Sequence, residues 1–428
     1  MSVSALRVEN IYKVFGRRGP EAVRRLDQGA SREDVAPLGT AAVIDASFDV
    51  QPGEIFVVMG LSGSGKSTLI RMLNGLLRPT AGHIYLGEDD LATVGPAALR
   101  DIRQQRVSMV FQHFALLPHR SVLDNAAYPL QVQGVGRTER RAKAEESLQM
   151  VGLEGWGDKL PSELSGGMRQ RVGLARALTA DTDILLMDEA FSALDPLIRR
   201  DMQEQLIDLQ QRLGKTVIFI THDLNEAMHL GDRIAVMRAG RIVQIGSAEE
   251  ILADPADDYV ARFIADVDRT RVLQASSLMR PPTVMLPVSS GPRRALHELS
   301  EAQMPASFVV DRERRFLGLV HDSDVLEAQR TGASDLSGIV KPGPLPVSTD
   351  ANLSELFAPA AESQLPLPVV DERHRLVGVI PRVSILKAMA PNESAPDATD
   401  PTVNLPWEAE PTDVGPDDGA TLVSGGPR

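Results

Sequence analysis

The chain has 428 residues, 43% of them hydrophobic, with a net charge of −13 at pH 7 and no cysteine. This length is enough for two or three domains of roughly 100–200 residues each. The lack of cysteine excludes disulfides, thiolate chemistry and cysteine-based metal sites, and an acidic chain is a poor candidate for a nucleic-acid binder. The N-terminal segment does not have the pattern of a signal peptide. Because no apolar run approaches the roughly 20 residues of a membrane helix, we expect membrane association through a partner or a surface.

Short apolar runs of strand length alternate with helical patterns in residues 1–266. Strands that alternate with helices predict an α/β domain with a largely parallel sheet. The expected strands lie at 54–60, 183–187 and 216–220, and the expected helices at 67–76, 166–178 and 197–213.

A glycine-rich motif joins the first of these strands to the helix after it. Residues 60–67, Gly-Leu-Ser-Gly-Ser-Gly-Lys-Ser, fit the pattern G-x-x-x-x-G-K-[ST]. In this motif the backbone N–H groups cradle phosphates, Lys66 reaches the β- and γ-phosphates, and the Ser67 hydroxyl holds Mg²⁺. The following helix points its N-terminus at the anion. We therefore expect ATP and Mg²⁺ as cofactors. The phosphate-site candidates are Gly60, Ser62, Gly63, Ser64, Gly65, Lys66, Ser67 and Thr68.

Two carboxylates follow the expected strand at 183–187. Asp188 can hold Mg²⁺ through water, and Glu189 can orient or deprotonate an attacking water. An Asp-Glu pair after a strand is ordinarily a helix cap, but a P-loop in the same chain favours the hydrolytic interpretation.

Several shorter motifs are weak evidence singly, and it is their order and spacing along the chain that indicate a function. Residues 164–168, Leu-Ser-Gly-Gly-Met, open a helix, and a serine with two glycines at a helix N-terminus is an anion site. Gln112 ends a strand-like run, the segment Ser192–Asp195 comes soon after the acidic pair, and His222 follows the strand at 216–220. Singly, such a glutamine is usually a surface residue and such a histidine a structural one.

In this order, the motifs resemble the ATPases of ABC transporters, over residues 8–266. The resemblance implies a homodimer that holds two ATP molecules head to tail. Ser165, Gly166 and Gly167 of one subunit would then meet the γ-phosphate held by the P-loop of the other. It further implies that Lys66 takes part in catalysis.

Other roles implied by the resemblance concern the metal, the water and the base. Glu189 would be the general base, and His222 would contact the γ-phosphate. Ser67, Gln112 and Asp188 would serve the metal, and Gln112 would also relay the state of the site to a membrane subunit. Phe15 matches the aromatic position that stacks on adenine in this family, and Tyr12 is the competing candidate.

Longer segments narrow the resemblance to the ATPase subunit of glycine betaine/proline-type osmoprotectant importers. They are IFVVMGLSGSGKSTLIRMLNGL, LSGGMRQRVGLARAL and DILLMDEAFSALDPLIR, and a charged, helix-like segment, Arg17–Thr40, precedes them. The family imports quaternary ammonium compounds through an integral membrane permease and a periplasmic or lipid-anchored substrate-binding protein. The resemblance therefore places the chain peripherally on the cytoplasmic face of the inner (plasma) membrane. It leaves choline, betaine, carnitine and proline open as solutes.

The region after the ATPase contains an internal repeat. Met304–Leu326 aligns with Leu365–Leu386 at a constant offset, so that Val310 matches Val370. Each copy is predicted as strand, turn, strand and helix, a stacked supersecondary unit. The tail at 391–428 is acidic and rich in proline, glycine and alanine, and it is predicted to be disordered.

The repeat pair resembles tandem CBS domains, at about 276–331 and 335–390 within 276–390. In the nucleotide-binding form of that module, a Ser or Thr and an Asp three residues later hold a ribose. His321 and Asp324 stand there in the first repeat, and Pro381 and Ser384 in the second. We therefore do not expect adenosine nucleotides to bind, and both sensing and simple packing with dimerisation stay open.

An apolar segment after Gln112 is expected to dock a permease helix, with local packing as the alternative. It includes His113, Phe114, Leu116, Leu117 and Pro118.

Arginines of the CBS region, chiefly the run Arg312–Arg315 on a predicted turn, predict an electrostatic latch on anionic lipid or a neighbouring subunit. Rising ionic strength would release such a latch. A solvated turn without a partner is the alternative.

Two other classes of protein fit the chain less well. Soluble ABC ATPases that act on nucleic acid or ribosomes usually have two cassettes in one chain or a long coiled-coil insertion. A purely regulatory CBS protein would have a degenerate ATPase, whereas Lys66, Asp188, Glu189 and His222 are all present.

Overall fold

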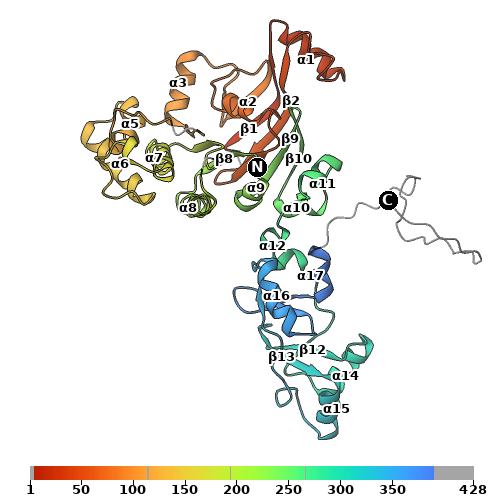
Figure 1. Cartoon of the computed structure of the whole chain (residues 1–428). Helices are drawn as coiled ribbons and strands as arrows, with labels where there is room; N and C mark the ends of the chain where they lie inside the picture. The colour runs from red at the N-terminus through yellow and green to blue at the C-terminus, as the bar shows by residue number, and fades with distance from the viewer. Residues whose placement is uncertain (1–3, 113–114, 193, 266, 390–428) are drawn as a thin grey trace, which may run out of the picture. The chain divides into compact units, whose positions relative to one another are not determined.

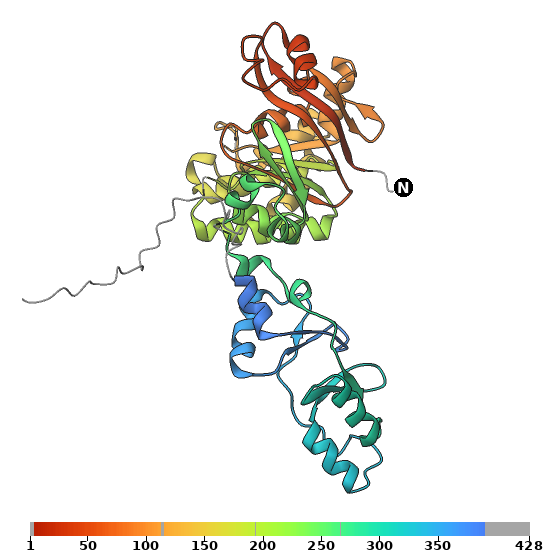
Figure 2. The same cartoon turned by 90° about the vertical axis from the view of Figure 1, so that its right-hand side faces the viewer.

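The structure, a computed structural model, describes residues 4–112, 115–192, 194–265 and 267–389 (Figures 1 and 2). The chain divides into two compact units, Met1–Ala390 and Pro391–Arg428. The second unit, where we predict a disordered tail, lies outside the described residues. All elements below belong to the first unit.

Six strands form the main sheet, in the order β10-β9-β3-β8-β7-β6. Neighbours from β9 to β6 pair in parallel, whereas β10 pairs antiparallel with β9. The predicted α/β class with a largely parallel sheet is confirmed. The strands are β3 (Ile55–Met59), β6 (Val107–Val110), β7 (Ile184–Asp188), β8 (Thr216–Thr221), β9 (Arg233–Arg238) and β10 (Arg241–Gly246).

The three predicted helices are α2 (Lys66–Leu73), α7 (Gly166–Thr179) and α8 (Pro196–Leu213). The helix α2 ends earlier than predicted because Gly75 takes a left-handed φ of +63° and the amide of Leu76 bonds back to the carbonyl of Arg71, the pattern that closes a helix. The other helices before residue 273 are α3 (Pro96–Gln105), α4 (Val122–Ala126), α5 (Tyr128–Val132), α6 (Arg137–Met150), α9 (Leu224–Leu230), α10 (Ala248–Ala253), α11 (Asp258–Phe263) and α12 (Arg269–Val272), with a 3₁₀ turn at Pro161–Glu163.

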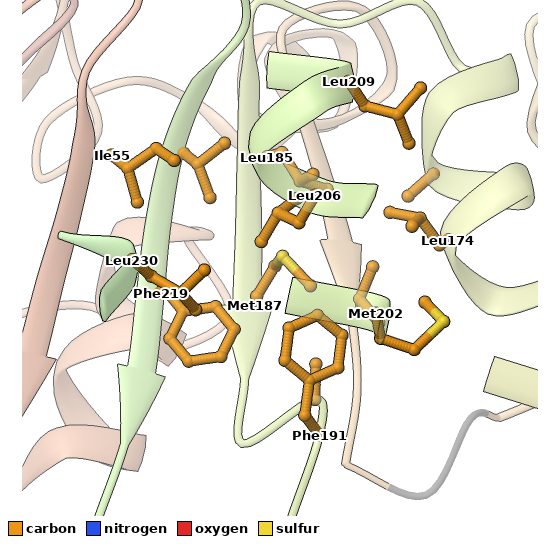
Figure 3. Close-up of a cluster of buried hydrophobic side chains, with 14 of the residues drawn as sticks. Ile55, Leu174, Leu185, Met187, Phe191, Met202, Leu206, Leu209, Phe219 and Leu230 are labelled. Atoms are coloured by element: carbon orange, nitrogen blue, oxygen red, sulfur yellow. The ribbon is translucent and has the colours of Figure 1, made fainter. Parts of the chain in front are cut away.

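Both faces of the main sheet are covered, which explains the unbroken apolar runs of its central strands. Every residue of β3 and of β8 is buried. On one face, Met187, Phe191, Met202 and Phe219 pack together in the core shared with α7 and α8 (Figure 3). On the other face, Phe56 belongs to the core shared with α2. The strand ends are thereby held in fixed positions.

A second, antiparallel sheet has the order β2-β1-β4-β5. Between its first two strands, the helix α1 (Gly19–Asp27) lies in the segment where we predicted helix-like character, and its apolar residues pack against Tyr12 and Val14. The strands are β1 (Leu6–Phe15), β2 (Thr40–Val50), β4 (Ala81–Leu86) and β5 (Asp89–Asp90).

Two three-stranded sheets after residue 284 repeat one topology. In each, the first strand is parallel to the second and the third is antiparallel to it. The register breaks at matching places, between Val309 and Val310 and between Val369 and Val370. The predicted repeat is confirmed. Its elements are α13 (Ala275–Leu278), β11 (Met285–Pro287), α14 (Pro292–Glu301), β12 (Ala306–Val310), β13 (Phe316–His321), α15 (Asp322–Arg330), β14 (Val347–Ser348), α16 (Leu353–Glu362), β15 (Leu367–Val370), β16 (Leu376–Ile380) and α17 (Arg382–Met389).

Candidate functional site

The glycines at 60–65 form a turn between β3 and α2 that excludes side chains. Gly60, Gly63 and Gly65 have φ values of +153°, +78° and +107°, which glycine adopts without strain. A Cβ on Gly60 would lie 2.3 Å from the carbonyl oxygen of Met237, and one on Gly65 would lie 2.3 Å from that of Ala42. Around Gly63 a Cβ would meet nothing within 4 Å. The turn is therefore packed on one side and open on the other.

Lys66 lies inside this turn. Its ammonium donates to the carbonyl oxygens of Gly60 at 2.7 Å and of Leu61 at 3.1 Å. Burial lowers the pKa of Lys66, while the carboxylates of Glu189 and Asp188 act in the opposite direction. The cation is thus held at the loop and faces the acidic pair.

Several polar groups of the turn are available to bind a ligand. The hydroxyl of Ser64 is buried and has no hydrogen-bond partner among the residues that the structure describes. Ser62 and Ser67 are exposed and Thr68 is half-buried. No side chain caps α2 at its N-cap Gly65, so the first turn of the helix faces the opening with uncapped amides.

The two carboxylates lie at the end of β7. Asp188 is its last residue, and Glu189 follows with a φ of +46°. Burial raises the pKa of Asp188 and the charge of Glu189 raises it further, whereas Arg71 and Lys66 lower it. Two half-buried carboxylates therefore lie side by side at this strand end, with Lys66 and Arg71 as the cations that act on Asp188.

Gln112, Glu189 and His222 meet. The Gln112 amide donates from Nε2 to Oε2 of Glu189 at 3.2 Å, and Nδ1 of His222 lies 3.2 Å from the same oxygen. The three residues follow β6, β7 and β8, which are neighbours in the sheet. Carboxyl ends of parallel strands are where ligands bind in α/β sheets. The structure thus brings together residues that are far apart in sequence.

Ser165, Gly166 and Gly167 open α7 at another place. The Ser165 hydroxyl caps the helix by accepting from the amide of Met168 at 3.3 Å. A Cβ on Gly166 would meet nothing, whereas one on Gly167 would lie 2.9 Å from Ile198. Within the described part of the chain, no hydrogen bond links Ser165 to the P-loop.

The two aromatic candidates differ in exposure. Tyr12 is only 6% exposed, and its hydroxyl donates to the carboxylate of Asp27. Phe15, at the end of β1, is 43% exposed, with the ammonium of Lys13 lying 5.3 Å from its ring centre. Only Phe15 of this pair has a free face for a ligand.

The apolar surface near Gln112 differs in part from our expectation. Leu116 is half-buried and packs against the core, so it serves local packing. His113 and Phe114 lie outside the described residues. Leu117 is half-buried and Pro118 is exposed. Phe111, Tyr128 and Val132 are also exposed, and they line a hollow of about 320 Å³. The sequence analysis missed them, although Phe111 directly precedes Gln112.

The CBS pair holds a further polar contact. Asp324 pairs with the ammonium of Lys341 at 2.7 Å, and this contact lowers the pKa of the carboxyl. The equivalent residue of the second repeat, Ser384, is buried. Neither position offers a free carboxylate.

A lysine inside a glycine turn and polar side chains at neighbouring strand ends define a P-loop nucleoside triphosphatase. A family model for ABC transporters matches residues 43–192, and one for the CBS domain matches 275–331 and 334–391. The chain belongs to the ATP-binding proteins of ABC transporters, in the group of the glycine betaine transport ATP-binding proteins, and it carries a CBS pair.

Three relatives illustrate this membership. The glycine betaine transport ATP-binding protein OpuAA of Bacillus subtilis is 48% identical, covering 90% of this chain and 93% of that protein. The glycine betaine/carnitine transport protein GbuA of Listeria monocytogenes is 47% identical over 91% of this chain and 99% of its own. The glycine betaine/proline betaine protein ProV of Salmonella typhimurium is 45% identical over 90% and 97%. Among the described residues, no helix is both long and apolar enough to span a membrane.

Proposed function

We propose that the chain is the ATP-hydrolysing subunit of an importer of glycine betaine and related quaternary ammonium compounds. The observation that carries the chemistry is the meeting of Gln112, Glu189 and His222 beside Lys66. The solute class rests on the names of the relatives, which transport glycine betaine, carnitine or proline betaine.

The phosphates of ATP fit the P-loop. The open side at Gly63, the uncapped start of α2 and the unpartnered hydroxyl of Ser64 form a cradle of donors. Helix N-termini of this kind bind phosphate. Lys66 would exchange its bonds to backbone carbonyls for bonds to the β- and γ-phosphates, and Ser62 and Thr68 would complete the cradle.

Mg²⁺ fits the oxygens around this cradle. Ser67, Gln112 and Asp188 would hold it, directly or through water, because Mg²⁺ takes oxygen ligands and keeps several waters. A cation here would also offset the burial and like charge that raise the pKa of Asp188. When bound, the ion neutralises charge on the phosphates.

Glu189 is the candidate general base. Gln112 and His222 both reach its Oε2, so the carboxylate is already oriented. It would take a proton from the attacking water while His222 contacts the γ-phosphate, consistent with the positioning role of such residues in phosphoryl transfer. A proton that arrives on Glu189 lies within reach of His222.

The ATPase domain of the chain acts as a homodimer. The Ser165–Gly167 start of α7 would close over the ATP bound to the P-loop of the second subunit, which is compatible with its lack of a contact to its own P-loop. Phe15 would stack on adenine, since Tyr12 is buried and bonded to Asp27.

The partner in the membrane is a permease, and a substrate-binding protein delivers solute to it from the other side. Phe111, Tyr128 and Val132 would dock a permease helix, because exposed apolar side chains around a hollow mark an interaction site. The chain would then lie peripherally on the cytoplasmic face.

The CBS pair would regulate transport. The hairpin turns of the two repeats meet. The backbone amide of Phe316 donates a hydrogen bond to the carbonyl oxygen of His374, and Arg315 and Arg375 form an isolated β-bridge. Arg312 and Arg314 are exposed on one of these turns. Arg315 pairs with Glu313 at 2.5 Å and Arg375 with Asp371 at 2.6 Å, so Arg312 and Arg314 would supply most of the positive charge that binds anionic lipid or a neighbouring subunit at low ionic strength.

The test is uptake by the reconstituted importer. Vesicles that contain the permease, the binding protein and this chain should accumulate labelled glycine betaine when ATP is supplied on the side of this chain. Competition by unlabelled choline, carnitine and proline ranks the solutes. Hydrolysis of ATP without uptake of any of them would contradict the proposed solute class.

A further inference from the structure

An arginine near the start of α8 joins two loops of the site. Arg199 donates from Nη1 to Oδ2 of Asp223 at 3.0 Å. Its Nη2 donates to the carbonyl oxygens of Leu194 at 3.3 Å and of Ser192 at 3.5 Å. One guanidinium therefore bonds both to the segment after the general base and to the residue after His222.

One helical turn further along α8, Gln203 makes a second link. Its amide donates to Oε1 of Glu226 at 3.0 Å, and the hydroxyl of Thr221 donates to the other oxygen of this carboxylate. The same hydroxyl accepts from the amide of Asp223 at 2.9 Å. Residues four apart share a face of a helix, so one face of α8 is linked to both residues that flank His222.

The backbone of Glu189 is tied to the same segment. The hydroxyl and the amide of Ser192 both donate to the carbonyl oxygen of Glu189, at 2.9 Å and 3.2 Å. The φ of +46° at Glu189 lies in the left-handed region, where a non-glycine residue stays only if its surroundings hold it there. Arg199 therefore contacts the backbone of Glu189 indirectly, through its hydrogen bond to Ser192.

We propose that Arg199 is a positioning residue that fixes the carboxylate of Glu189 relative to the imidazole of His222 during hydrolysis. The inference rests on the proposed function, because these two side chains need alignment only if ATP is hydrolysed here. A guanidinium holds its donors in a rigid planar fork, whereas a lysine ammonium is a single point of charge. A displacement of about 1 Å at a reacting centre lowers rates strongly. Loss of the fork should therefore lower kcat and leave ATP binding at the P-loop unchanged.

A substitution at Asp223 can remove the bond to Arg199, and with it the alignment of Glu189 and His222, without removing the cap of α9. Its Oδ1 caps α9 by accepting from the amides of Asn225 at 3.0 Å and Glu226 at 3.2 Å, while its Oδ2 takes the bond from Arg199. The variant Asp223→Asn keeps an oxygen for the cap and replaces the partner of Arg199 by an amide NH₂. Since two donors repel, the link is lost while the helix cap stays.

The experiment measures kcat and KM for ATP in the full chain carrying Arg199→Ala, Arg199→Lys or Asp223→Asn. We expect Arg199→Ala and Asp223→Asn to lower kcat by about tenfold or more with KM changed less than about threefold, and Arg199→Lys to recover part of the loss. The matched control is Arg200→Ala, which removes the same charge from the neighbouring, exposed position and should keep wild-type kcat. The double variant Arg199→Ala/Asp223→Asn should lose no more than the worse single variant.

Wild-type kcat in folded Arg199→Ala, a loss confined to KM, or additive losses in the double variant would each overturn the inference and leave the proposed function standing. If Arg199→Ala does not fold, Asp223→Asn decides by the same readout. A wild-type chain that does not hydrolyse ATP removes both proposals together.

Discussion

Nδ1 of His222 lies 3.2 Å from the carboxylate of Glu189, although the two residues follow different strands. Gln112, at the end of a third strand, reaches the same oxygen. The carboxylate that we propose as the base is thus oriented by the folded chain itself. Such preorganisation means that little rearrangement is needed when a nucleotide arrives.

The first prediction concerns the base. Glu189→Gln should lower ATP turnover by about 10²–10⁴, the typical contribution of a general base, because it removes the proton acceptor and leaves the phosphate cradle intact. ATP affinity, measured by equilibrium binding, should stay close to that of the wild type. Glu204→Gln is the matched control, since Glu204 faces His229 at 3.1 Å on the surface. Wild-type turnover in Glu189→Gln would rule out the assignment.

The second prediction concerns the composite site. Lys66→Ala should weaken ATP binding because it removes a phosphate contact, and Ser165→Ala should damage the site of the opposite subunit. In a dimer of one Lys66→Ala and one Ser165→Ala subunit, both defects fall on one site and the other site is intact. Mixed dimers should therefore trap nucleotide at up to half of their sites. Mixed dimers that trap no more than the parent variants would contradict the head-to-tail arrangement.

The third prediction concerns pH. Burial raises the pKa of Glu226, although its bonds from Thr221 and Gln203 oppose the shift. An acid with a raised native pKa contributes stability below its unfolded pKa, about 4.3, and this contribution is lost as the pH rises through the native value. The free energy of unfolding of the wild type should therefore fall over that window relative to Glu226→Gln. Urea unfolding at successive pH values measures the difference, and a difference independent of pH would show that Glu226 is not the cause.

The fourth prediction concerns docking. The chain has no natural cysteine, so a cysteine placed at Phe111, Tyr128 or Val132 is unique. Each should crosslink to a cysteine on a cytoplasmic helix of the permease. A cysteine at Leu213, which is also an exposed apolar position, should not. Equal crosslinking from all positions, or none from the three, would exclude this surface.

The fifth prediction concerns regulation. Screening shortens the Debye length from about 10 Å at 0.1 M salt to about 3 Å at 1 M, and each basic residue near an anionic membrane contributes about 1 kcal/mol. Neutralising Arg312, Arg314 and Arg315, or deleting Ser276–Ala390, should therefore leave uptake high at low internal salt. Vesicles with a series of anionic-lipid contents measure the threshold.

Its control is the same charge change elsewhere in the CBS pair, at Arg293, Arg294 and Arg330, which lie on helices outside the hairpin turns. This triple variant should keep the wild-type threshold. An unchanged threshold after neutralisation of the hairpin arginines would place the salt response outside the CBS pair.

Local patterns in the sequence were enough to predict the P-loop, the strands and the repeat. The turn at Gly60 and the buried run of β3 depend on residues next to one another, so their order in the chain reveals them. Arg199 and Asp223 stand 24 positions apart and meet only because α8 packs beside α9. The contact of Leu116 with the core and the exposure of Tyr128 likewise follow from tertiary packing, which no short pattern encodes.

The matched register breaks at Val309–Val310 and Val369–Val370 mean that the two repeats share a backbone, while Asp324 and Ser384 give them unequal chemistry. At equivalent places, the first repeat therefore presents an ion pair and the second a buried hydroxyl, so the pair is alike in its backbone and unlike in its chemistry.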